Sequence, residues 1–181
     1  MALKPTVYKF KISLSDLDRA YFDALNLTLA KHPSENEERM MVRLLGYCLN
    51  AQEFLSFGAG LSEADDPAIS VRTLDDQLAL WIDVGEPEPE RIKKATRKAQ
   101  QVKVYSFNTK SDVWWEQNAA QFERLDVDVY RFDWANVQSF AKMLERTMDF
   151  SVTISGNSAY LATAKGECEV SWETLQQKHD V

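Results

Sequence analysis

The sequence has few of the residues that mark disulfide-rich, metal-binding or loop-rich proteins. Its 181 residues include two cysteines, two histidines, five prolines and six glycines. Cys48 and Cys168 lack the spacing of a metal or redox motif, so we expect reduced thiols in a cytoplasmic protein. His32 and His179 lie far apart in the sequence, which therefore offers no histidine-based metal motif.

Long apolar runs and phosphate-binding glycine loops are also missing. No segment approaches the roughly 20 consecutive apolar residues that a membrane-spanning helix needs. The first ten residues, MALKPTVYKF, lack the apolar core of a signal peptide. The sequence contains no glycine-rich nucleotide loop and no nucleophile elbow. We therefore expect no membrane partner and no chemistry that depends on these motifs.

Positive charge is scarce. The chain has 21 Lys and Arg against 28 Asp and Glu, which gives a net charge of −7. Proteins that bind the phosphate backbone of nucleic acids rely on clustered basic residues. The densest basic stretch here is RIKKATRK, residues 91–98. The charge balance counts against a nucleic-acid partner without excluding one, and it favours a protein partner.

Apolar periodicity predicts strands and helices that alternate through the middle of the chain. The length and the hydrophobic share of 45% indicate one domain, residues 1–181. Helical patterns cover residues 33–55, 87–100, 111–122 and 133–146. Strand patterns cover residues 6–15, 23–30, 68–73, 77–84, 102–107, 126–132, 148–155 and 158–164. The predicted class is α/β, a mixed sheet flanked by helices, with β-hairpins at both ends of the chain.

The helix over residues 33–55 is predicted to begin with a capping box, in which Ser34 is the N-cap and Glu37 reaches back to it. Glu35 and Glu37 fit as first-turn acids that the helix dipole favours. Glu38 differs, because it lies on the apolar face of the helix. Two interpretations stay open: a carboxylate in a functional cleft, or a frayed first turn that leaves Glu38 in water.

The strand over residues 77–84 contains a carboxylate, Asp83, although both of its faces are apolar. A buried ionised carboxylate is costly unless it is paired or binds a cation. Asp83 therefore faces a cleft at the strand end or lies at a solvated terminus. In the preceding segment EADDP, alternation places Asp66 rather than Asp65 beside the same opening. Turn chemistry is the alternative explanation for an Asp-Pro pair.

Glu38, Asp66 and Asp83, on a helix start and two adjacent strands, form a candidate site for Mg²⁺ or Mn²⁺. Mg²⁺ prefers oxygen ligands and needs only one or two carboxylates besides water. A metal-bound water can attack a phosphodiester while a nearby lysine stabilises the charge that develops. A cation at this place would also explain why Asp83 is tolerated in an apolar strand.

Three motifs resemble the bacterial YaeQ family: HPSENEERMM (32–41), LWIDVGEPEPERIKKA (80–95) and VKVYSFN (102–108). The resemblance extends over essentially the whole chain. It implies a variant of the PD-(D/E)XK nuclease fold, which is restriction-endonuclease-like. In that superfamily a helix acid precedes an acid that opens one strand and an acid at the end of the next strand.

Carried over residue by residue, the resemblance assigns three acids to the active site. Glu38 matches the helix acid, and Asp66, with Asp65 beside it, matches the acid that opens a strand. Asp83 matches the acidic member of the D/E-X-K element. These are the same three carboxylates that periodicity brings forward.

The chain departs from the superfamily pattern two residues after Asp83, where Gly85 stands in place of the expected lysine. A basic residue of the following helix is the natural substitute. We expect this role for Lys94, and Lys93 and Arg91 remain alternatives. The helical phase alone does not decide among the three.

Two functions remain open. In the first, the chain is a metal-dependent phosphodiesterase of nuclease type, in which Glu38, Asp66 and Asp83 hold Mg²⁺ or Mn²⁺ and Lys94 supports the transition state. In the second, the chain is a catalytically inactive descendant of that fold and acts as a protein-interaction or regulatory module. The missing lysine is compatible with either function.

Overall fold

The computed structural model describes residues 4–59 and 65–179. These residues form ten strands and four helices, joined by loops and turns. The strands are β1 (Thr6–Asp16), β2 (Tyr21–Lys31), β3 (Leu55–Phe57), β4 (Ile69–Arg72), β5 (Leu78–Val84), β6 (Ala99–Ser106), β7 (Asp128–Phe132), β8 (Thr147–Ser155), β9 (Ser158–Thr163) and β10 (Gly166–Gln176). The helices are α1 (Glu37–Leu49), α2 (Pro89–Lys98), α3 (Ser111–Glu123) and α4 (Trp134–Ala141). None of these helices has the length and apolar content needed to cross a membrane.

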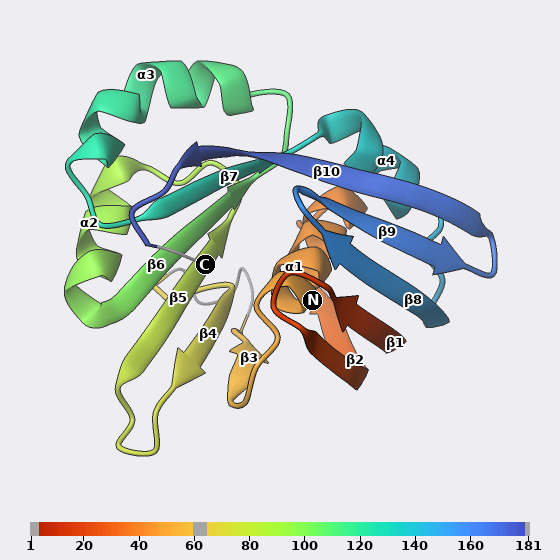
Figure 1. The fold of residues 1–181 in the computed structure, drawn as a ribbon. Coiled ribbons are helices and arrows are strands. Elements are labelled where there is room, and N and C mark those ends of the chain that lie inside the picture. Colours follow the sequence, from red (N-terminus) through yellow and green to blue (C-terminus); the bar gives the residue numbers. More distant parts are fainter. Residues whose placement is uncertain (1–3, 60–64, 180–181) are drawn as a thin grey trace.

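The strands form one mixed sheet in the order β2-β1-β8-β9-β10-β7-β6-β5-β4-β3. The pairs β1–β8, β5–β6 and β6–β7 are parallel, and the other neighbours are antiparallel. Figure 1 shows the sheet curving so far that its two ends approach each other, with α1 lying inside the curve and α2 and α3 outside it. The predicted mixed α/β class with terminal hairpins is confirmed.

The strand β10 joins the two halves of this sheet (Figure 1). Its first half, Gly166 to Ser171, pairs with β9, and its second half, from Trp172 onward, pairs with β7. The sequence patterns predicted no regular element beyond residue 164, so β10 was not predicted. Its alternation is weak because only Val170 is buried, so most of its side chains stay partly in water on both faces.

The start and end of α1 differ from the prediction. The N-cap is Asn36, whose side chain accepts a hydrogen bond from the Arg39 N–H at 2.8 Å. Ser34 was the predicted N-cap, but its hydroxyl lies 2.6 Å from His32 Nδ1 and is engaged there instead. The helix ends at Leu49 rather than continuing to residue 55, because the chain turns there to enter β3.

The buried acid at the start of α1 is Glu35, which precedes the helix, while Glu38 in the first turn is half-buried. The Glu35 carboxylate accepts hydrogen bonds from Arg43 at 2.7 and 2.8 Å and also pairs with Arg39. The Arg43 side chain is only 3% exposed and also donates to the Ala30 carbonyl of β2. This ion-pair network therefore fastens the start of α1 to one edge of the sheet.

We predict that Glu35→Ala lowers the free energy of unfolding by about 3–5 kcal/mol, the range for removing one partner of a buried ion pair. The cost arises because Arg43 keeps its buried charge and loses its carboxylate. Urea denaturation followed by circular dichroism measures the change. The exposed Glu53, replaced by alanine, is the matched control and should shift stability by no more than about 0.5 kcal/mol. Equal effects of the two substitutions would contradict the prediction.

Candidate functional site

Asp83, at the end of β5, is neutralised by an arginine of α2. The residue is 4% exposed. Arg91 donates from Nε to Asp83 Oδ2 at 2.7 Å and from Nη2 to Asp83 Oδ1 at 3.2 Å. This two-pronged contact is the strongest geometry for an arginine–carboxylate pair. It explains how an apolar strand tolerates an ionised side chain.

The second predicted strand acid, Asp66, lies at the same end of the sheet. β4 runs antiparallel to β5, with Ile69 opposite Ile82, so the segment before β4 reaches the carboxyl end of β5. The Asp66 carbonyl accepts a hydrogen bond from Arg91 Nη2 at 2.9 Å, whereas its side chain is exposed. The hydrogen bond that Arg91 donates to Asp83 raises the pKa of Arg91, and the charges of Asp65 and Asp66 add to this effect.

Backbone geometry explains why no lysine stands two residues after Asp83. Gly85 has a φ of +115°, a conformation that side-chain-bearing residues rarely adopt. Its N–H donates to the Tyr105 carbonyl of β6 at 2.8 Å, and the chain bends at this glycine before α2 begins. The first turn of α2 then brings Arg91 back over Asp83, with its guanidinium 5.6 Å from the Trp81 ring centroid. Arg91, one of the three candidates, is thus the basic residue that reaches Asp83.

The other two predicted residues are placed differently. Lys94 is exposed on α2, while its helix neighbours Ile92 and Ala95 face the sheet. Glu38 is half-buried in the first turn of α1. Within the described residues, neither side chain forms an ion pair. The structure brings Asp66 and Asp83 together around Arg91 and records no polar contact that adds Glu38 or Lys94.

This arrangement does not fit a divalent cation. Both oxygens of Asp83 already accept hydrogen bonds from Arg91. Across residues 4–59 and 65–179, no three side chains of the His, Cys, Asp and Glu types lie close enough to hold a metal ion. A Mg²⁺ site needs oxygen ligands that are free to turn toward the ion.

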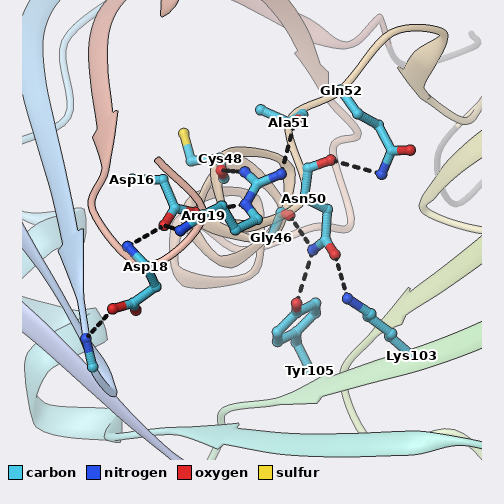
Figure 2. Close-up of polar contacts among 11 residues, drawn as sticks. Asp16, Asp18, Arg19, Gly46, Cys48, Asn50, Ala51, Gln52, Lys103 and Tyr105 are labelled. Atoms are coloured by element: carbon cyan, nitrogen blue, oxygen red, sulfur yellow. Dashed lines mark hydrogen bonds and ion pairs between the residues drawn. The ribbon is translucent and has the colours of Figure 1, made fainter. Parts of the chain in front are cut away.

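A second polar site, which the sequence analysis missed, surrounds the C-terminal end of α1 (Figure 2). Arg19, after β1, donates to the Ala51 and Cys48 carbonyls at 2.9 and 3.4 Å. Its Nε pairs with the buried Asp16 at 2.7 Å. From the opposite side, Lys103 of β6 donates to Asn50 Oδ1 at 2.7 Å. Two cations from separate halves of the sheet therefore meet at one helix end.

A cavity of about 280 Å³ opens beside Lys103, and we call it the Lys103 cavity. Its lining residues are Asp16, Asp18, Arg19, Leu49, Lys103, Tyr105, Tyr130, Ile154, Gly156, Asn157, Trp172, Thr174 and Gln177. Burial lowers the pKa of Lys103, and the charge of Asp128 on the neighbouring strand opposes this shift. The sequence signal was a lysine inside the apolar strand VKVYSF, which is as unusual there as Asp83 in its own strand.

Comparisons of the chain with known proteins agree on one family. The model of the family described as YaeQ protein matches residues 1–172. The chain is 38% identical over 181 residues to the uncharacterised protein YaeQ of Salmonella typhi, covering 98% of this chain and 99% of the relative. It is 37% identical over 179 residues to that of Escherichia coli K12, with the same coverage.

Two crystal structures of YaeQ proteins are similar along nearly the whole chain. The one from Xanthomonas axonopodis pv. citri has a TM-score of 0.93 and 32% identity, covering 96% of this chain and 99% of its own. The one from Pseudomonas syringae has a TM-score of 0.91 and 33% identity, covering 96% and 97%. The ten-stranded architecture is therefore similar to structures determined by experiment.

We predict that Arg91→Met lowers the free energy of unfolding by about 2–4 kcal/mol, because it leaves Asp83 buried without a partner. The value lies toward the low end for buried pairs, since the Arg91 side chain remains 33% exposed. The double variant Arg91→Met, Asp83→Leu should recover most of this loss, because no unpaired charge remains. Urea denaturation of the two variants and the wild type forms the test. A double variant no more stable than Arg91→Met would contradict the charge explanation.

The stacked pair Tyr105 and Tyr130 predicts a loss of stability at alkaline pH. Burial raises the pKa of Tyr130 to about 12 from an ordinary value of 10 and also raises that of Tyr105. The unfolded chain loses these protons first, so the free energy of unfolding falls as the pH rises from 10 to about 12. Urea denaturation across this range should show a shallower fall for Tyr130→Phe than for the wild type. Identical slopes would assign the loss to other groups.

Proposed function

The chain belongs to the YaeQ family, and we propose that it is a binding or regulatory module on a nuclease-like fold that does not cleave phosphodiesters with a metal. The observation that carries this proposal is the contact of Arg91 with both oxygens of Asp83. The guanidinium takes the place of the cation that a nuclease of this type would need. Asp83 then serves to hold α2 on the sheet.

The order of the elements supports the nuclease-like half of the proposal. In the middle of the chain α1 precedes Asp66, β4 begins three residues after it at Ile69, and β5 follows with Asp83 near its end. This is the succession of a helix, a strand opened by an acid and a strand ended by an acid that the family resemblance implies. This order supports a nuclease-like scaffold, and in our proposal Arg91 changes the chemistry of its site.

The charge distribution supports a partner other than nucleic acid. The chain carries a net charge of −7, and binding to a phosphate backbone rests on a concentrated basic surface. At the candidate site the single arginine is already shared by Asp83 and the Asp66 carbonyl, with Asp65 and Asp66 adding negative charge beside it. A protein or a small molecule fits this electrostatic surface better than a polyanion.

A metal-dependent phosphodiesterase is the second candidate, and one observation favours it. Asp65, Asp66 and Asp83 all raise the pKa of the same guanidinium at one end of the sheet, and this local negative charge supports a bound cation there. In that alternative, Arg91 would have to release Asp83 before a metal could bind.

Calorimetric titration with Mn²⁺ and Mg²⁺ separates the two functions. We predict that the wild type shows no saturable heat up to about 10 mM metal, because a bidentate arginine competes for the only buried carboxylate of the site. Incubation with labelled single- and double-stranded DNA and RNA under the same conditions should give no cleavage products above those of a metal-free control.

The variant Asp83→Asn and the surface control Asp149→Asn complete the design. Asp149 is an exposed acid on β8, so its replacement removes one charge far from the site. Metal binding or cleavage that survives in Asp149→Asn and is lost in Asp83→Asn would overturn the proposal and establish the phosphodiesterase. Metal binding lost equally in both variants would reflect surface charge alone.

A further inference from the structure

We propose that the Lys103 cavity binds a small organic monoanion, a carboxylate with an apolar body, whose charged group contacts Lys103. The cavity lies on the face of the sheet opposite to Asp83, since Asp83 is level with Val104 and Lys103 is level with Ile82. The inference goes beyond the proposed function, and it stands whether or not the acidic end of β5 has catalytic activity.

The Lys103 ammonium group is incompletely satisfied by the protein. An ammonium has three N–H donors, and within the described residues Lys103 uses one of them, toward Asn50 Oδ1 at 2.7 Å. No carboxylate forms an ion pair with it in residues 4–59 and 65–179. Burial of a charged group is unfavourable without acceptors, and the lowered pKa of Lys103 reflects this. An acceptor within the cavity would complete the coordination of the amine.

The side chain of Lys103 is held in place by Asn50, which is itself held by two hydrogen bonds. Asn50 donates from Nδ2 to the Gly46 carbonyl and to the Tyr105 hydroxyl, both at 2.8 Å. These two bonds orient the amide so that Oδ1 faces Lys103 (Figure 2). The lysine is thus held at the cavity wall by a side chain that is itself held by α1 and β6.

The other charged groups of the cavity wall already have partners. Arg19 pairs with Asp16 and donates to two carbonyls at the end of α1. Asp18 accepts a hydrogen bond from the Gly156 N–H at 3.2 Å. Lys103 is therefore the cation of the described lining that no carboxylate pairs with, whereas Arg19 is neutralised by Asp16.

Aromatic side chains form an apolar wall next to the lysine. Tyr105 and Tyr130 stack with ring centroids 5.2 Å apart and an interplanar angle of 20°. Trp172 lines the same cavity and lies edge-on to Phe132 at 5.7 Å. The volume of about 280 Å³ is near the lower end of the range for ligand pockets. A single ring or a short chain is therefore the body that fits.

Charge argues for a carboxylate over a phosphate. Asp16 and Asp18 line the cavity, and Asp128 lies beside Lys103 on β7. The Asp128 carboxylate is held by the Lys178 and His179 N–H groups, so it stays in place. Lys103 is the one cation of the described lining without a carboxylate partner, and three acids lie near it, so the site can balance the charge of a monoanion. A phosphate dianion would need several positively charged donors.

The test is calorimetry and ligand-observed NMR on the full chain with benzoate, phenylacetate and hexanoate as probes. We expect saturable binding of at least one of them to the wild type. Lys103→Met should weaken it about tenfold to a hundredfold, the size of one charge-assisted hydrogen bond. The exposed Lys93→Met keeps the affinity and controls for net charge. Asn50→Asp should also weaken binding while keeping the lysine, because the new carboxylate would pair with Lys103 and neutralise its charge.

Three results would overturn the proposal. The first is no binding of any of the three acids up to about 10 mM, the weakest affinity that such a contact would give. The second is equal affinity for benzoate and its neutral counterpart benzamide, or unchanged affinity in Lys103→Met. The third is binding of inorganic phosphate, lost in Lys103→Met, without binding of the carboxylates. Circular dichroism of each variant verifies that it is folded.

Discussion

The C-terminal end of α1 is the place on which the rest of the structure depends. A helix end of this kind carries partial negative charge and unpaired carbonyls, and α1 has no basic residue in its own last turn. The compensation comes from elsewhere: Arg19 arrives from the β1–β2 half of the sheet and Lys103 from the β6 half. Since both halves are anchored to one helix end, α1 holds the curved sheet together from inside, while β10 joins the two halves by pairing with β9 and with β7.

Two buried charges on neighbouring strands have opposite roles in this architecture. Asp83 faces α2, and its carboxylate is closed off by Arg91. Lys103 faces the inside of the curve, where it keeps donors directed toward a cavity. A satisfied ion pair fixes structure, whereas an incompletely satisfied charge provides a place for a ligand. The ligand site that we propose therefore lies on the inner face of the sheet, and the carboxylate near the end of β5 has a structural role in the same proposal.

Local patterns predicted most of the regular elements, and the misses have identifiable causes. Alternation identified β5 and marked Asp83 as a charge in need of a partner, which is what the structure contains. The capping pattern pointed to Ser34, but His32 engages that hydroxyl and Asn36 caps the helix. β10 was not predicted, because its side chains are half-exposed on both faces and give little alternation. Arg91 rather than Lys94 reaches Asp83 because the chain turns at Gly85 before α2 begins. The helical phase of α2 alone does not show how this turn orients the helix.

The sequence by itself determined the α/β class and the presence of charges inside apolar strands, because these follow from periodicity within short windows. It also carried the family resemblance, which rests on specific motifs such as LWIDVGEPEPERIKKA. Only the tertiary structure decided what neutralises each charge. Ion pairs and hydrogen bonds act over a few ångströms, and the partners of Asp83, Glu35 and Lys103 lie 8, 8 and 53 residues away along the chain. The pairing of the strands and the position of α1 inside the sheet decide which acid pairs with an arginine. They also decide which lysine keeps a free donor.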